Sequence, residues 1–158
     1  MRLKDKVVLV TGSTTGIGEG IVRRFVAEGA KVIVHGRNAE RGRALCDELG
    51  SENAVFCQGD LGEAGYPEQL AKDALATFGR MDGLVNNAGL VTRAMLADTD
   101  AAFFDRLMAV NARAPMLLIR ALLPALKESK GSVLNIGSIL AWCGVEKLLA
   151  YSMSKGAL

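Results

Sequence analysis

Tyr151 and Lys155 lie four positions apart in the sequence. Residues at this spacing share one face of an α-helix, so the phenol and the ammonium group would lie side by side. A free phenol is a poor base at neutral pH, but an adjacent ammonium stabilises its anion. Such a tyrosine can give a proton to a carbonyl oxygen or take one from an alcohol. The pair therefore predicts acid–base chemistry at an oxygen atom, although a lone Tyr-x-x-x-Lys is also common in an exposed helix turn.

A glycine-rich loop offers a second chemical function. The segment Thr11-Gly12-Ser13-Thr14-Thr15-Gly16-Ile17-Gly18 follows an apolar run and opens a stretch with helical spacing. Gly12 can turn without a Cβ penalty, Gly16 lets the backbone approach a ligand, and Gly18 lets the helix pack on the strand. The helix N-terminus then presents free N–H groups to a pyrophosphate. No Lys-Ser or Lys-Thr pair follows the last glycine, which disfavours a Walker loop and favours a dinucleotide.

The end of the next apolar run predicts which dinucleotide fits. A fold of this kind that binds NAD carries an acidic residue there, which holds the ribose 2′-hydroxyl. The stretch His35-Gly36-Arg37-Asn38 has no carboxylate, and the guanidinium of Arg37 can pair with a 2′-phosphate. We therefore expect NADP(H) rather than NAD(H). His35 is the only histidine in the chain, and without a second one we expect it to be neither catalytic nor a metal ligand.

The elements that must position these residues alternate between short β-branched runs and longer helical stretches. Strands are predicted at 6–10, 31–35, 54–57, 82–86 and 132–136, and helices at 18–29, 38–49, 67–78, 100–126 and from about 150 onward. Strands that alternate with helices imply a parallel sheet covered on both faces. Pro115 is expected to kink or break the long helix. The predicted fold class is α/β, a Rossmann-like doubly wound parallel sheet in one domain spanning 1–158.

Composition excludes several classes of function. Of the 158 residues, 50% are hydrophobic and 23% are charged, which indicates a folded globule. The net charge is only +2 and the charges are scattered, so we expect no nucleic-acid or membrane partner. We find no signal peptide and no apolar run long enough to cross a membrane. The cysteines Cys46, Cys57 and Cys143 are odd in number and lack metal-ligand spacing, which predicts reduced thiols, no metal site and a cytoplasmic location.

With the loop and the acid–base pair in place, the sequence resembles the short-chain dehydrogenase/reductase family over essentially its whole length. Within that family it is most similar to the 3-oxoacyl-acyl-carrier-protein reductases. The resemblance rests on the glycine-rich loop, Asp60, Asn86-Asn87-Ala88-Gly89, Asn111, Ser138 and Tyr151-x-x-x-Lys155. Each piece is weak alone, but their order and spacing together are specific.

The resemblance implies a catalytic set of Asn111, Ser138, Tyr151 and Lys155. Tyr151 would deliver the proton, and Ser138 would donate to the substrate oxygen as negative charge develops there. Lys155 would also hydrogen-bond the nicotinamide ribose, and Asn111 would hold a water that links Lys155 to solvent. The cofactor would supply the hydride, so the implied reaction is reduction of a carbonyl by NADPH.

The resemblance also implies a cofactor-binding set that extends beyond the loop. Asp60 would accept from the exocyclic amine of adenine, and Leu61 would lie against the ring. Residues 87–89 would line the ribose side. The full set is Gly12, Ser13, Thr14, Thr15, Gly16, Ile17, Gly18, Arg37, Asp60, Leu61, Asn87, Ala88, Gly89, Tyr151 and Lys155.

Two functions of different classes stay open. The first is an NADP(H)-dependent carbonyl reductase; a 3-oxoacyl thioester is the favoured substrate, and a sugar, polyol or steroid-type alcohol is the alternative. The second is a catalytically inactive dinucleotide-binding or scaffold subunit. The family pattern continues past Lys155, so we expect a sheet truncated after its fifth strand. The full-length form is expected to be a homo-oligomer, either a dimer or a tetramer.

Overall fold

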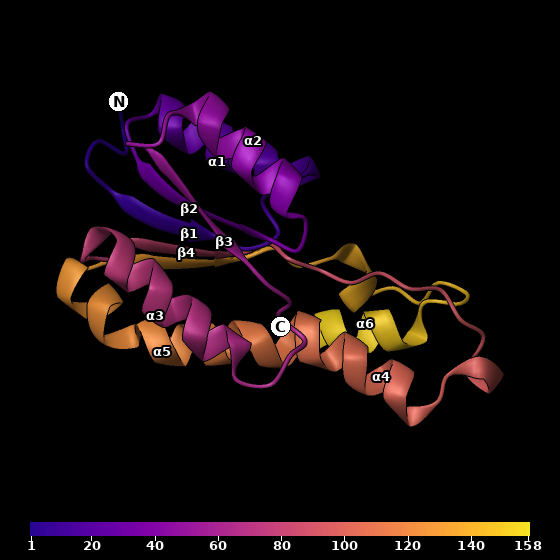
Figure 1. Ribbon diagram of the computed structural model, residues 1–158. Coiled ribbons are helices and arrows are strands. Elements are labelled where there is room, and N and C mark those ends of the chain that lie inside the picture. The colour runs from indigo at the N-terminus through magenta and orange to yellow at the C-terminus, as the bar shows by residue number, and fades with distance from the viewer.

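A five-stranded sheet forms the centre of the molecule, and all of its strand pairings are parallel (Figure 1). The computed structural model describes residues 1–158. In chain order the strands are β1 (Val7–Val10), β2 (Lys31–Gly36), β3 (Ala54–Gln58), β4 (Gly83–Asn86) and β5 (Ser132–Asn135). Their order across the sheet is β3-β2-β1-β4-β5, so the direction of winding reverses between β1 and β4. This is a doubly wound α/β sheet, and the predicted fold class is confirmed.

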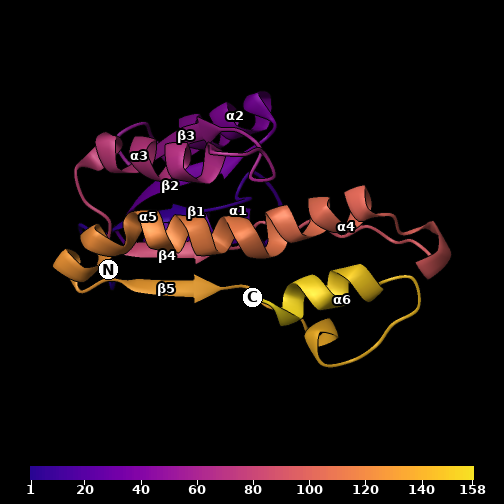
Figure 2. The same cartoon turned by 90° about the horizontal axis from the view of Figure 1, so that it is seen from below.

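Helices lie on both faces of the sheet. One layer holds α1 (Gly16–Ala27) and α2 (Ala39–Leu49), and the opposite layer holds α3 (Tyr66–Phe78) and α5 (Ala114–Ser129) (Figure 1). Two further helices, α4 (Ala101–Met108) and α6 (Leu149–Gly156), extend beyond the carboxyl edge of the sheet (Figure 2). The short 3-10 turns η1 (Leu96–Asp98) and η3 (Ile139–Ala141) precede α4 and α6 and were not predicted.

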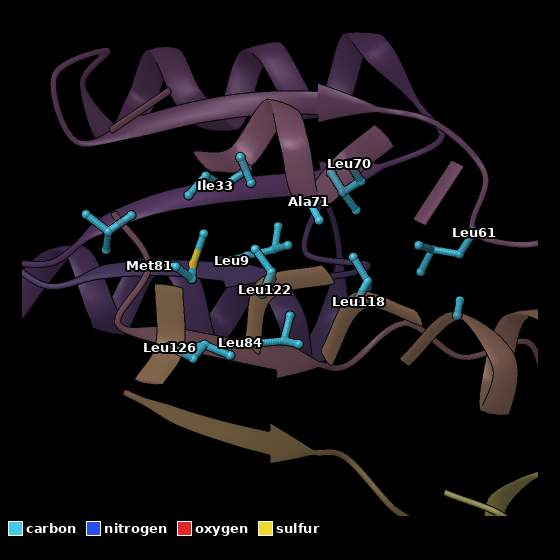
Figure 3. Close-up of a cluster of buried hydrophobic side chains, with 13 residues drawn as sticks. Leu9, Ile33, Leu61, Leu70, Ala71, Met81, Leu84, Leu118, Leu122 and Leu126 are labelled. Carbon is cyan, nitrogen blue, oxygen red and sulfur yellow. The ribbon is translucent and has the colours of Figure 1, made fainter. Parts of the chain in front are cut away.

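The core has two halves because successive side chains of each strand point to opposite faces. Val8 and Val10 of β1 face α1 and α2, within a cluster of ten buried residues. Val7 and Leu9 face α3 and α5, within a second cluster of thirteen, which is drawn in Figure 3. A strand with apolar residues on both faces must be covered on both, which explains the continuous apolar runs in the sequence.

The edge strand β5 departs from this pattern. All four of its residues are exposed, including Val133 and Leu134. The expectation that the sheet is covered on both faces therefore holds for the central strands and is wrong for β5. The physical reason is that β5 is an edge strand of the sheet, on which α5 packs without covering it. All three cysteines are free.

The long helix changes its hydrogen bonding in the middle. Residues Ala109–Arg113 form a π-helical turn, η2, between α4 and α5. Pro115 has no N–H, so the carbonyl of Asn111, four residues earlier, loses its α-helical donor. The predicted break at Pro115 thus falls just upstream of the proline. It places Asn111 in a π-turn, a feature that is frequent at functional sites.

The helical run 101–129 is longer than the apolar stretch expected from the sequence. It has 29 residues, and its most apolar 18-residue window has a mean hydropathy of 1.3, which is enough by length and composition alone to cross a membrane. In the fold this run packs against α3 and the sheet, and it buries Leu118, Leu122 and Leu126 in the second core cluster. It therefore has the packing of a core helix.

Candidate dinucleotide and catalytic site

A cavity of about 350 Å³ opens at the carboxyl ends of β1, β2 and β4, next to the point where the winding of the sheet reverses. Ligands of open α/β sheets bind in this crevice. Ten of the fifteen predicted cofactor residues line it, namely Gly12, Thr14, Thr15, Ile17, Arg37, Asp60, Leu61, Asn87, Ala88 and Gly89. Six lining residues were not in the predicted set, namely His35, Gly36, Gly59, Leu90, Arg106 and Val110.

The glycine-rich loop has the backbone conformation that its sequence predicts. Gly12 and Gly16 have φ values of 62° and 59°, in the left-handed region that favours glycine. A Cβ on Gly18 would lie 2.5 Å from both the Asn87 side-chain nitrogen and the Gly12 carbonyl oxygen. Gly18 thus lets α1 pack directly against the loop. Around Gly16, by contrast, no atom lies within 4 Å of an ideal Cβ, which leaves open space at the start of α1.

Side chains just after the ends of β1 and β4 attach the loop to the sheet. The Thr11 hydroxyl accepts from the N–H groups of Asn87 and Ala88, each at 3.1 Å. The Asn87 amide donates to the carbonyls of Thr11 and Gly12 at 2.9 and 3.0 Å. Asn87 thus holds the phosphate loop and also lines the cavity. The anchoring role of Thr11 was missed, because nothing in the sequence shows that β1 and β4 are neighbours.

His35 also fastens the loop, although we expected no chemical role for it. The Gly12 N–H donates to His35 Nδ1 at 3.3 Å, and the side chain is 3% exposed. Two further hydrogen bonds join the same two segments, because Ser13 N–H donates to the His35 carbonyl and His35 N–H donates to the Ser13 hydroxyl. Burial lowers the pKa of His35 to about 4, so the imidazole is neutral at neutral pH.

Two arginines line the cavity, and only one of them forms an ion pair within the protein. Arg106 of α4 pairs with the Asp60 carboxylate, which also accepts from the Gly62 N–H at 2.8 Å. Burial alone would raise the pKa of Asp60, but the hydrogen bonds from Arg106 and Gly62 outweigh it and hold that pKa below its usual value. Arg37 is exposed at the cavity wall and makes no ion pair in the protein. The Arg37 guanidinium is therefore the one of these two cations that can pair with an anionic ligand.

Gly89 connects the cavity to the predicted catalytic residues. An ideal Cβ on Gly89 would lie 3.8 Å from Lys155 Nζ and 4.0 Å from Asn111 Oδ1. Lys155 is 6% exposed and donates to the Ile136 carbonyl at 2.7 Å. Burial lowers the pKa of its ammonium group. The structure therefore brings Lys155 and Asn111 to the rim of the dinucleotide cavity.

The Asn111 side chain makes three hydrogen bonds within the protein. Its Oδ1 accepts from Leu90 N–H at 2.8 Å, and its Nδ2 donates to the Leu90 carbonyl and to the Ser154 hydroxyl, each at 2.9 Å. Ser154 in turn donates to the Tyr151 carbonyl at 2.7 Å. This chain of hydrogen bonds ties the π-turn to the turn of α6 that carries Tyr151 and Lys155.

Ser138 and Tyr151 lie on the segment that leaves β5. Ser138 caps η3, and its oxygen accepts from the Leu140 N–H at 3.2 Å, so its proton stays available for another acceptor. Tyr151 lies in the first turn of α6 and is 9% exposed. The bond from Lys155 to Ile136 holds α6 close to the end of β5, two residues before Ser138.

The family model named short chain dehydrogenase matches residues 6–158. The chain belongs to the short-chain dehydrogenase family. L-fucose dehydrogenase of Mus musculus is 39% identical over 99% of this chain and 57% of its own length. The 2-(S)-hydroxypropyl-CoM dehydrogenase 3 of Xanthobacter autotrophicus is 36% identical over 99% of this chain and 63% of its own length. The sequence-based assignment to the family is confirmed.

Solved structures share this fold. A metagenomic short-chain oxidoreductase in complex with NADP has a TM-score of 0.93 and 36% identity, over 100% of this chain and 73% of that one. A blue fluorescent protein from a metagenomic library in complex with NADPH has the same TM-score at 34% identity. The chain spans about three-fifths of the length of the curated relatives that it matches first.

Proposed function

We propose that this short-chain dehydrogenase is an NADP(H)-dependent oxidoreductase that interconverts a carbonyl and an alcohol, with Tyr151 as the proton donor to the carbonyl oxygen. The observation that carries the proposal is the meeting of two features at Gly89. Gly89 lines the dinucleotide cavity, and the Lys155 ammonium lies beside it on the same helix as Tyr151. A hydride carrier and a proton donor must act on the two ends of one C=O bond, so their sites have to adjoin.

The residues of the cavity fit a dinucleotide. The helix α1 begins at Gly16, and its N-cap residue Thr15 makes no side-chain capping bond. The first N–H groups of α1 are therefore open to a pyrophosphate, beside the empty space at Gly16. Asp60 offers a fixed carboxylate for the adenine end. When bound, the dinucleotide supplies or accepts the hydride.

Arg37 supports NADP(H) over NAD(H). Its guanidinium lines the cavity at the end of β2, where it can pair with a 2′-phosphate. No carboxylate follows β2 in this position to hold a 2′-hydroxyl. The two solved structures described above also contain NADP or NADPH.

The protein residues then move the proton. Tyr151 gives its hydroxyl proton to the substrate oxygen, and the Lys155 ammonium stabilises the phenolate that results. The Ser138 hydroxyl donates to the same oxygen as charge develops. Because protein groups already bond both Nδ2 and Oδ1 of Asn111, we place the water that resupplies the proton at its main-chain carbonyl, which Pro115 leaves without an α-helical donor.

We favour a hydroxylated substrate of the sugar or polyol kind and its carbonyl partner. The support comes from the relatives described above, two of which are named for alcohol oxidation, one of them with a sugar as substrate. A 3-oxoacyl thioester, which the sequence resemblance favours, is the second candidate. Both substrates present the same C–O centre to Tyr151, so the site chemistry does not distinguish them.

The test is a substrate panel followed by the absorbance of NADPH. Purified protein is mixed with NADPH and a ketose or a 3-oxoacyl thioester, and with NADP and the matching alcohols. We expect turnover with at least one pair, faster for a sugar or polyol than for the thioester. NADPH binding without any turnover would contradict the proposal and support the inactive scaffold subunit instead.

A further inference from the structure

We propose that His35 is a positioning residue for the dinucleotide: its Nδ1 atom holds the N–H of Gly12 and so sets the shape of the phosphate loop. This inference rests on the proposed function, because it concerns the same cavity. It assigns a role to a side chain that the sequence left without one.

The geometry shows why the imidazole controls the loop. Gly12 is the first residue after β1 that needs a positive φ, and its N–H points at His35 Nδ1, 3.3 Å away. The carbonyl of Gly12 is held from the other side by the Asn87 amide. Both hydrogen-bonding groups of Gly12 are thus fixed by side chains, one from β2 and one from the residue after β4. Neither bond is part of the regular strand pairing.

The imidazole must carry its proton on the other nitrogen. Nδ1 accepts a hydrogen bond, so in the neutral ring Nε2 is protonated. That Nε2 atom is buried and makes no hydrogen bond of regular geometry, although the Gly59 backbone is close enough to favour its protonation, and His35 lines the cavity. A buried polar group without a partner costs free energy, so a residue that served packing alone would be better replaced by an apolar one.

The surroundings of the ring keep it neutral. Tyr66 of α3 packs against it with ring centroids 5.8 Å apart, and Cys57 is its register partner on β3. Burial raises the pKa of both the Tyr66 phenol and the Cys57 thiol, so neither contributes a charge at neutral pH. The charged neighbours are Asp60, which Arg106 already neutralises, and the exposed Arg37 on the same strand end. Nδ1 therefore remains an acceptor across the neutral range.

The experiment compares two amides at position 35. In His35→Asn the side-chain oxygen takes the place of Nδ1 and can still accept from Gly12. In His35→Gln the amide reaches the place of Nε2 and leaves the Gly12 N–H without an acceptor. Both variants are neutral and polar, so they share the cost of losing the aromatic ring. NADPH affinity is measured by fluorescence titration, and the free energy of unfolding by urea in the absence of NADPH.

We expect the NADPH affinity of His35→Asn to lie within about threefold of that of the wild type. The affinity of His35→Gln should be about tenfold weaker, which corresponds to roughly 1.4 kcal/mol of binding free energy. Equal affinities in the two variants would overturn the proposal and leave His35 a packing residue. If either variant fails to fold, wild-type protein is titrated at falling pH with NAD, which has no 2′-phosphate to titrate, because protonation of Nδ1 begins to remove the acceptor as the pH approaches 4. Affinity that stays constant from neutral pH to pH 4 would then overturn it.

The wild-type titration separates this proposal from the proposed function. A wild-type protein that binds no NADPH overturns both. A wild-type protein that binds NADPH, together with equal affinities in the two variants, overturns the role of His35 alone.

Discussion

Arg37 and Arg106 both reach the dinucleotide cavity, but only Arg37 is free of an ion pair within the protein. We predict that Arg37→Ala weakens NADPH binding about tenfold or more, since a hydrogen bond to a charged group contributes about 1.5–3 kcal/mol. NADH binding should change by less than about threefold, because NADH has no 2′-phosphate. Isothermal titration with both dinucleotides measures this.

Arg43→Ala is the matched control for Arg37→Ala. Arg43 lies on the neighbouring helix α2, is exposed and does not line the cavity, so the net charge changes equally in the two variants. An equal loss of NADPH and NADH affinity in Arg37→Ala would remove the case for the 2′-phosphate. So would an equal loss of NADPH affinity in the two variants.

His35 gives the folded protein a specific dependence on acid. Its pKa is lowered from 6.5 to about 4 in the folded protein. Between these two pH values the imidazole is protonated in the unfolded chain and neutral in the folded protein. Its contribution to stability is complete above about pH 6.5 and is lost as the pH falls toward 4, where the loss reaches about 3 kcal/mol. Urea unfolding at several pH values should show this slope in the wild type and a shallower one in His35→Asn. Identical slopes would contradict the assignment.

Several cavity residues could not be predicted because their positions depend on tertiary structure. The contact between His35 and Gly12 follows from the register of β1 beside β2. The contact of Arg106 with Asp60 follows from the position of α4 against the end of β3. In contrast, the roles of Gly12 and Gly18 were readable, because glycine is required there by local backbone geometry and close approach.

Helix α1 is the element on which the phosphate site depends. Gly18 and Gly20 are both inside it, yet only Gly18 faces the loop. We predict that Gly18→Ala lowers the free energy of unfolding by about 1–3 kcal/mol, because the new methyl group overlaps a backbone oxygen. NADPH affinity should fall with it, because the loop must shift. Urea unfolding and NADPH titration measure the two effects.

Gly20→Ala is the control within the same helix. No atom lies within 4 Å of an ideal Cβ on Gly20, so the substitution should stabilise the protein by up to about 1 kcal/mol through helix propensity. NADPH affinity should be unchanged. A Gly18→Ala protein that is as stable as Gly20→Ala would contradict the close packing of α1 on the loop.

At the element scale, periodicity predicted every main strand and helix to within a few residues, because buried faces impose a period of two or 3.6. Two features lay outside that signal. The π-turn at Asn111 depends on which carbonyl accepts the hydrogen bond of each N–H group. The sequence predicts a break there only through the nearby Pro115. The exposure of β5 depends on what lies over it, although its residues Val133 and Leu134 are as apolar as those of a covered strand.

Asp82 links the amino ends of the neighbouring strands β1 and β4. It accepts from Val7 N–H at 3.0 Å and forms ion pairs with Lys6 and Arg80. Burial opposes ionisation, but these partners prevail and lower the pKa of Asp82 to about 2. Its stabilising effect is complete above about pH 4 and is lost as the pH falls through 2, a window below that of His35.

We therefore predict that Asp82→Asn lowers the free energy of unfolding by about 2 kcal/mol at neutral pH, as the pKa shift implies. The difference from the wild type should vanish near pH 2. Circular dichroism of urea unfolding at neutral and acidic pH provides the measurement. A variant as stable as the wild type at neutral pH would show that the three contacts contribute nothing net.

At the scale of the molecule, the alternation of strands and helices predicted a doubly wound sheet, and the order of its motifs predicted the family. The sequence left the substrate open, because the C–O chemistry of Tyr151 and Lys155 is common to sugars, polyols and thioesters. The fold explains the arrangement of the parts. The reversal between β1 and β4 places the phosphate loop and residues 87–89 side by side. Lys155 lies beside Gly89 at the same edge of the sheet.

The most direct test of the proposed reaction is Tyr151→Phe, measured by NADPH oxidation with the best carbonyl substrate of the panel. The variant keeps the ring and removes only the hydroxyl that would donate the proton. We predict a loss of at least about a hundredfold in kcat, the typical contribution of a general acid, with NADPH affinity within about threefold of the wild type. Unchanged turnover in Tyr151→Phe would contradict the assignment of Tyr151 as the proton donor, and with it the proposed mechanism.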